Sequence, residues 1–119
     1  MKIEIVLNDI SMITTLDDNP STKELYEHIK ENNLTLKLEE YGGFEYVGQL
    51  GFSLTRNDES INTKPGDIVL YNGNQISIMY GSNSWSYTNL GKLETKFINN
   101  LNKILGNGDI AITIKAMEG

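Results

Sequence analysis

Residues 82–88, Ser-Asn-Ser-Trp-Ser-Tyr-Thr, carry the side chains of this chain best suited to recognising a ligand. Hydroxyl and amide groups form adaptable hydrogen bonds, while tryptophan and tyrosine combine a large apolar ring with a polar edge. Asn83, Trp85 and Tyr87 are therefore candidate ligand-binding residues. The structural alternative is that Trp85 plugs one end of the fold and the serines cap turns.

Five further residues are candidates for the same groove. Phe44 and Tyr46 lie two positions apart, so a strand would place both on one side, where they either line a groove or belong to the core. Gln75 is suited to hydrogen-bonding the amide of a bound peptide, and Tyr80 would add a further ring to the groove. Arg56, the only arginine, is either a solvated loop charge or an anchor for a carboxylate or phosphate.

No residue pattern indicates a particular reaction, and no catalytic residue is assigned. His28 is the only histidine, and it falls in a predicted helix without the positioned partner that acid–base catalysis or a Ser-His-Asp set requires. The acidic pairs at 17–18 and 39–40 are adjacent, so in a strand their carboxylates would point to opposite faces. Calcium-loop and phosphate-loop spacings do not occur. We therefore expect no cofactor and no metal site.

The composition limits which classes of partner and which cell compartment are expected. A net charge of −6 argues against nucleic acid and anionic membranes, because both require a basic surface. The chain has no cysteine, no apolar stretch of signal-peptide length at its start, and no run approaching the roughly 18 apolar residues of a membrane helix. We predict one cytoplasmic domain over residues 1–119; the sequence does not indicate its oligomeric state.

The first half of the chain alternates between apolar and polar residues. Strands are predicted at 2–7 and 10–16, joined as a hairpin, and at 34–39. Between them, Ser21 and Glu24 have the spacing of a capping box that starts a helix, and Asn32-Asn33 ends it. Residues 44–54 read as a short strand, a turn at Gly48 and a further short strand, and residues 55–66 as the longest loop.

The second half contains the clearest local signal. Asn72-Gly73 separates strands at 67–71 and 75–80, and this dipeptide best tolerates the two positive φ angles of a type I′ hairpin turn. A strand is predicted at 86–90, ended by Gly91. Apolar residues recur at helical spacing from 94 to 105, with Gly106 as C-cap, and Asn107-Gly108 turns the chain into a β-branched strand at 110–116.

The order of these elements predicts a mainly β fold. Short, mostly antiparallel strands interrupted by two helices favour a closed or nearly closed barrel of about eight strands, with the helices covering its ends. Closure would also protect the very apolar strands at 68–70 and 110–114, which would be prone to aggregate as free edges.

Three segments of the chain resemble the small bacterial cyclophilin-like proteins. They are YGGFEYVGQLG at 41–51, TKPGDIVLYNGNQISIMYGSNSWSYTNLGKL at 63–93, and the terminal strand. This resemblance covers nearly the whole chain and implies a compact cyclophilin barrel, in a family whose activity is uncharacterised.

A weaker similarity extends to the true cyclophilins, which are peptidyl-prolyl isomerases. Phe-Glu-Tyr-Val at 44–47 stands where those enzymes have Phe-His-Arg-Ile, Gly-Asn-Gln at 73–75 resembles their Gly-Ser-Gln, and Leu-Gly-Lys-Leu at 90–93 resembles their Phe-Gly-Lys-Val. The resemblance places Tyr46 at the position of the catalytic arginine. A tyrosine hydroxyl is a neutral and weaker donor than a guanidinium group.

A preserved scaffold with a replaced arginine implies a module that binds a peptide segment or a small ligand in a groove. Two alternatives remain: a peptidyl-prolyl isomerase of weak activity, and an enzyme that uses Arg56 and Tyr46 on an anionic substrate. The groove residues expected from residue type and resemblance together are Phe44, Tyr46, Arg56, Gln75, Tyr80, Asn83, Trp85 and Tyr87.

Overall fold

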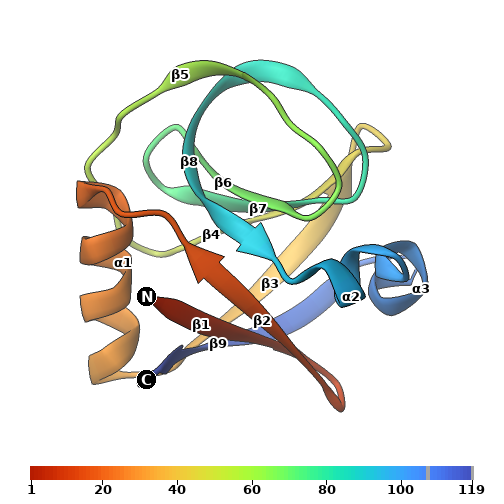
Figure 1. Ribbon diagram of the computed structural model, residues 1–119, viewed down its shortest axis with the longest axis horizontal. Helices are drawn as coiled ribbons and strands as arrows, with labels where there is room; N and C mark the ends of the chain where they lie inside the picture. The colour runs from red at the N-terminus through yellow and green to blue at the C-terminus, as the bar shows by residue number, and fades with distance from the viewer. Residues whose placement is uncertain (107, 119) are drawn as a thin grey trace.

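A computed structural model describes residues 1–106 and 108–118, and Figure 1 shows the course of the chain. The strands are β1 (Lys2–Leu7), β2 (Ile10–Leu16), β3 (Leu34–Tyr41), β4 (Glu45–Gln49), β5 (Glu59–Asn62), β6 (Asp67–Tyr71), β7 (Gln75–Met79), β8 (Ser84–Leu93) and β9 (Ile110–Met117). The helices are α1 (Pro20–Glu31), α2 (Thr95–Ile98) and α3 (Leu101–Leu105).

Eight of the strands close into an antiparallel barrel, which confirms the predicted fold class. Neighbouring strands follow the order β2-β1-β9-β3-β4-β7-β6-β8, and β8 pairs back to β2 through Thr14↔Leu93, Thr15↔Lys92 and Leu16↔Gly91. β6 and β9 each lie between two paired neighbours in this order, so these apolar strands present no free edge, and closure itself pairs β2 with β8, the two end strands of the order.

The hairpin predicted from Asn72-Gly73 is confirmed as the β6–β7 connection. Asn72 and Gly73 have φ angles of 54° and 77°, and β6 pairs with β7 from Ile68↔Ile78 to Tyr71↔Gln75. Two positive φ angles match the twist of the turn to the right-handed twist of the strands. The short turn therefore sets the register of β6 against β7.

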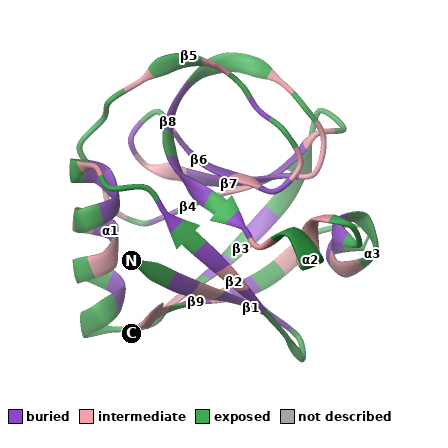
Figure 2. Cartoon of the chain, viewed as in Figure 1, coloured by how far each residue is buried: buried purple, intermediate pink, exposed green. Residues whose placement is uncertain are grey.

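The main hydrophobic core fills the barrel. Alternate side chains of the strands point inward, among them the fully buried Ile5 of β1, Ile68 of β6 and Ile78 of β7. Figure 2 shows α1 with its buried side toward the strands and its exposed side outward. Leu25 of α1 and Leu105 of α3 belong to the same core, so both helices pack on the barrel.

Helix α1 begins differently from the prediction. Its N-cap is Asn19, whose Oδ1 accepts a hydrogen bond from Thr22 N at 2.8 Å, and Thr22 Oγ1 accepts one from Asn19 N at 3.1 Å. Pro20 suits the first helical position because its missing N–H needs no partner there. Ser21 and Glu24, the predicted capping pair, instead bind Thr55: Glu24 Oε1 accepts from Thr55 N at 2.8 Å. The predicted end of the helix at Asn32 is confirmed.

The predicted second helix is divided into α2 and α3. Asn100 between them has φ −120° and ψ 18°, which is outside the helical region, so the hydrogen-bond ladder is interrupted there. Gly106 is the C-cap of α3, as expected. The turn predicted at Asn107-Gly108 includes Asn107, which lies outside the described residues. None of the helices in residues 1–106 and 108–118 is long and apolar enough to cross a membrane.

Two glycines that predicted a turn or a strand end lie inside strands. Gly48 is within β4 and Gly91 is within β8. A Cβ at Gly48 would overlap the carbonyl oxygen of Lys37, and a Cβ at Gly91 would overlap that of Thr15. These positions therefore need glycine because a neighbouring strand approaches closely, which local sequence does not reveal.

Residues 55–66, predicted as a loop, contain β5. This strand pairs with the first part of β8, from Glu59↔Tyr87 to Asn62↔Ser84, and the two form a ribbon that arches away from the barrel at the top of Figure 1. A second hydrophobic cluster joins the ribbon to the barrel. Its members are the buried Val69, Met79 and Tyr87 and the partly buried Phe44, Ile61 and Tyr71.

Candidate functional site

A cavity of about 430 Å³ lies on the outer face of the barrel, next to the β5–β8 ribbon. We call it the aromatic pocket because five of its nine lining residues are aromatic. Its lining residues are Tyr41, Phe44, Glu45, Val47, Tyr71, Gln75, Asn83, Trp85 and Tyr87.

Strand register decides which side chains face the aromatic pocket. β4 pairs with β7 so that Glu45 is opposite Met79 and Tyr46 is opposite Ile78. Because successive side chains of a strand point to opposite faces, Glu45 and Val47 face outward while Tyr46 and Ile78 face the core. The floor of the pocket is therefore the outward face of β4, and the ribbon supplies a wall.

The aromatic side chains form the rim and one side of the pocket. Tyr41 and Trp85 are 63% and 58% exposed, whereas Tyr87 is 3% exposed. The rings of Tyr41 and Phe44 meet edge to face with centroids 6.1 Å apart, and those of Tyr71 and Tyr87 do so at 6.3 Å. The ring quadrupoles favour such edge-to-face pairs, so the aromatic side chains of the lining pack on one another.

Asn83 is held firmly at the pocket. Its backbone N donates to Thr63 Oγ1 at 2.9 Å, and its backbone oxygen accepts from Thr63 N at 2.9 Å. Its side-chain Nδ2 donates to the Tyr87 hydroxyl at 2.8 Å. Burial raises the pKa of Tyr87, so this hydroxyl remains protonated near neutral pH. Asn83 and Tyr87 thus present an oriented amide and hydroxyl.

Glu45 is the functional group of the pocket that the sequence analysis missed. It is 7% exposed, and the hydroxyl of Ser77 on β7 donates a hydrogen bond to its Oε1. Burial raises the pKa of Glu45, although the bond from Ser77 partly opposes the shift. Strand alternation around Tyr46 was the available signal, since a core-facing Tyr46 requires an outward Glu45.

Five of the eight predicted groove residues line the aromatic pocket: Phe44, Gln75, Asn83, Trp85 and Tyr87. The expectation that Phe44 and Tyr46 share one side of a strand is not met, because β4 begins at Glu45 and Tyr46 points into the barrel. Tyr46, which the resemblance set at the position of a catalytic arginine, therefore lies outside the aromatic pocket.

Tyr46 and Tyr80 line a second cavity, also of about 430 Å³, together with Glu40, Asn102, Leu105, Gly106 and Gly108. The Tyr46 hydroxyl donates to Gly106 O at 2.9 Å. The Tyr80 hydroxyl donates to Glu40 Oε1 at 2.6 Å, and this hydrogen bond raises the pKa of Tyr80 to about 12. Both hydroxyls are thus already engaged.

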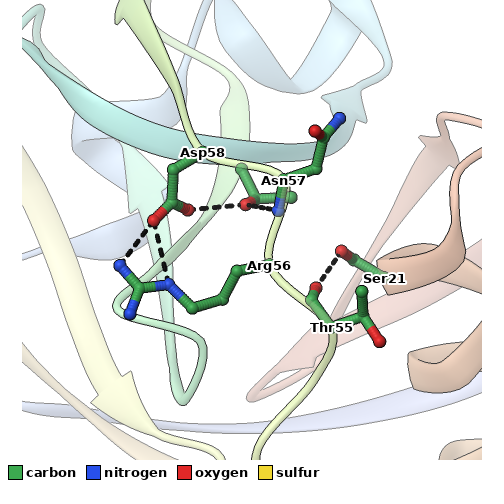
Figure 3. Close-up of polar contacts among 6 residues, drawn as sticks. Ser21, Thr55, Arg56, Asn57 and Asp58 are labelled. Atoms are coloured by element: carbon green, nitrogen blue, oxygen red, sulfur yellow. Dashed lines mark hydrogen bonds and ion pairs between the residues drawn. The ribbon is translucent and has the colours of Figure 1, made fainter.

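Arg56 lines neither cavity. Its Nε and Nη2 donate to Asp58 Oδ2 at 2.9 and 2.5 Å, as Figure 3 shows. Asp58 Oδ1 accepts from Thr88 Oγ1 at 2.7 Å, and Thr88 Oγ1 accepts from Asn57 N at 2.8 Å. Burial raises the pKa of Asp58, but the hydrogen bonds from Thr88 and Arg56 outweigh it and hold that pKa below its usual value. Arg56 therefore belongs to a network that fixes the segment before β5.

Residues suited to metal binding are not grouped in the described part of the chain. No cluster of three His, Cys, Asp or Glu residues occurs within residues 1–106 and 108–118 that would hold a metal ion. His28 lies on α1, and its ring stacks on Phe52 with centroids 3.8 Å apart and planes 6° apart. His28 thus packs against Phe52, and neither residue lines the aromatic pocket.

Comparison with solved structures shows the same fold in two other proteins. The solution structure of the hypothetical protein AF2241 from Archaeoglobus fulgidus aligns with a TM-score of 0.69 and 11% identity, over 98% of this chain and 95% of that one. McbB, solved in complex with tryptophan, aligns with a TM-score of 0.65 and 13% identity, over 98% of this chain and 45% of McbB. At these identities the likeness shows the fold alone.

Sequence comparison supplies the family. No curated protein sequence matches the chain significantly. The model of the cyclophilin-like family matches residues 5–115. This range contains all of the barrel strands apart from three residues at the start of β1 and two at the end of β9. The match therefore spans the barrel, both flanking helical regions and the aromatic pocket. The chain belongs to the cyclophilin-like family.

Proposed function

We propose that this protein is a binding module that holds a peptide segment or a small ligand in the aromatic pocket. The observation that carries the proposal is the composition of the pocket: five aromatic rings surround a cavity of about 430 Å³ into which a carboxylate and two amides project. Ligand sites in proteins are typically concave and mostly apolar, with a few polar groups that orient the ligand.

The state of the rim supports the proposal. Trp85 and Tyr41 keep more than half of their surface exposed, although tryptophan is highly buried on average and tyrosine partly so. A ligand that enters the pocket would cover both rings. Burial of such amphipathic rings commonly supplies a large part of a binding energy.

Isomerase activity lacks support in the geometry. Tyr46, which the resemblance set in place of the catalytic arginine, is 3% exposed and hydrogen-bonded to Gly106 O. The lining of the aromatic pocket contains no Arg, Lys or His side chain in the described residues. Binding without turnover is therefore the function that the pocket supports best.

Titrations followed by ¹H–¹⁵N NMR test the proposal. The probes are a set of blocked tripeptides of differing central residue, and free tryptophan. We expect the side-chain signals of Asn83, Gln75 and Trp85 to shift, and the side-chain amide of Asn102 in the second cavity to stay in place. Shifts confined to Asn102, or no shift with any probe, would contradict the proposal.

A proline-isomerisation assay addresses the alternative function. We expect the wild-type protein to leave the rate for a proline tetrapeptide at the uncatalysed value. Turnover well above that rate would instead show an isomerase that works without an arginine in this pocket.

A further inference from the structure

We infer that the aromatic pocket selects ligands that carry a positively charged nitrogen, such as a primary ammonium or a guanidinium group, and that Glu45 is the residue that recognises this charge. The inference rests on the proposed function, because it concerns the same pocket, and it defines the chemical class of the ligand.

The carboxylate of Glu45 has one oxygen available to the cavity. Within the described residues, Oε1 accepts the bond from Ser77 and Oε2 accepts none. The fully buried polar side-chain atoms without a partner in this part of the chain are Thr14 Oγ1 and Asn74 Oδ1. Oε2 of Glu45 is not among them, so it keeps some exposed surface although Glu45 as a whole is 7% exposed. Because Glu45 lines the aromatic pocket, Oε2 is the carboxylate oxygen left for a ligand.

Glu45 has no cationic partner among the described residues. The ion pairs of the structure join other groups, and Arg56 is engaged by Asp58. A buried charge normally has a partner, because removing an unpaired carboxylate from water is costly. A ligand cation would supply the partner that the chain itself does not.

The surrounding rings favour the same sign of charge. The face of an aromatic ring carries negative electrostatic potential, so a cation within about 6 Å of the ring centre is attracted to it. Tyr41, Phe44, Tyr71 and Trp85 line the cavity together with Glu45. The ring faces and the carboxylate would therefore both attract a cation, whereas the Glu45 carboxylate would repel an anion.

The charge of the whole protein acts in the same direction. The net charge of −6 produces a negative potential that raises the local concentration of cations around a cleft. A neutral ligand would gain from the rings alone and would leave Oε2 without a partner. Cation recognition is thus the use of the pocket that engages both the rings and the carboxylate of Glu45.

Matched pairs of probes test the inference. Acetyl-Gly-Lys-Gly-amide is compared with the same peptide carrying Nε-acetyl-lysine, and acetyl-Gly-Arg-Gly-amide with its citrulline analogue, by NMR titration at low ionic strength. We expect each cationic peptide to bind at least about tenfold more tightly than its neutral partner. Added salt should reduce this preference.

Glu45→Gln isolates the role of the carboxylate. The glutamine side chain keeps the shape and an acceptor for Ser77 but removes the charge, so the preference for the cationic peptide should fall several-fold. Glu31→Gln removes one charge from the exposed end of α1, at a residue that does not line the pocket, and should leave the preference intact. An undiminished preference in Glu45→Gln would overturn the inference.

The outcomes separate the inference from the proposed function. Equal binding of cationic and neutral peptides, with shifts at Asn83 and Trp85, overturns cation selection while the binding function stands. No shift at these residues with any of the four peptides overturns cation selection, and the wider probe set then decides on the binding function. The wild-type comparison needs no variant, so it remains decisive even where Glu45→Gln does not fold.

Discussion

The hydroxyl of Ser77 donates a hydrogen bond to the carboxylate of Glu45 at the floor of the aromatic pocket. The two residues lie on the adjacent strands β7 and β4, and Ser77 is fully buried. A polar pair at this depth is costly unless it is satisfied, so the hydrogen bond between Ser77 and Glu45 is needed for both side chains to be buried on this sheet face.

The stability of the protein should depend on the ionisation of Glu45. Burial raises the folded-state pKa of this carboxyl above its usual 4.5, so the protonated form is favoured on folding. Its contribution to the free energy of unfolding is fully present below pH 4.5 and is lost as pH rises through the folded-state pKa. The other titratable side chains lining the pocket with Glu45 are tyrosines.

Urea unfolding of the wild type and Glu45→Gln between pH 4 and pH 8 measures this effect. We expect the difference in unfolding free energy between the two proteins to change in favour of the glutamine variant as pH rises, and then to level off. A difference that stays constant with pH would show that Glu45 titrates alike in the folded and unfolded chain.

Removal of the Tyr46 hydroxyl should destabilise the fold without affecting the aromatic pocket. Tyr46→Phe leaves the carbonyl of Gly106 without its donor, and we expect a loss of about 1 kcal/mol in unfolding free energy. Tyr41→Phe is the control, because that ring is 63% exposed and its hydroxyl has no partner among the described residues. Altered peptide binding in Tyr46→Phe would link the two cavities, against expectation.

Alanine at Gly91 should disrupt the closure of the barrel. The new methyl group would overlap the backbone oxygen of Thr15, where β8 pairs with β2, and neither backbone has room to move inside a closed sheet. We expect a loss of about 2–4 kcal/mol in chemical denaturation. Ser86→Ala, at an exposed position of the same strand, should cost less than about 0.5 kcal/mol. Equal stabilities would mean that the sheet opens readily at this seam.

The network before β5 should depend more on Thr88 than on Arg56. Thr88→Val removes the acceptor of Asn57 N and the donor to Asp58 at a position that is 1% exposed, and should cost about 1–3 kcal/mol. The Arg56–Asp58 ion pair is half exposed on the arginine side, so Arg56→Ala should cost about 0–1 kcal/mol. Urea midpoints of both variants decide the ranking; the reverse order would make the ion pair the main support.

The sequence by itself determined those parts of the fold that short-range interactions specify. The alternation of Ile3, Ile5 and Leu7 identified a half-buried strand, and Asn72-Gly73 identified the central hairpin, because backbone preferences and side-chain period act within a few residues. Residue type together with the family resemblance grouped Asn83, Trp85 and Gln75 as candidates, and the structure has all three in the lining of one cavity; their role in binding stays a prediction.

The tertiary structure alone decided which face of each strand became the pocket. The pairing of β4 with β7, about thirty positions later in the chain, turns Glu45 outward and Tyr46 inward, and a shift of one residue would exchange them. The sequence alone also misread Gly48 and Gly91 as a turn and a strand end. Both positions need glycine because the backbones of Lys37 and Thr15 on neighbouring strands approach them closely. Such contacts join residues distant in sequence, so only the closed barrel reveals them.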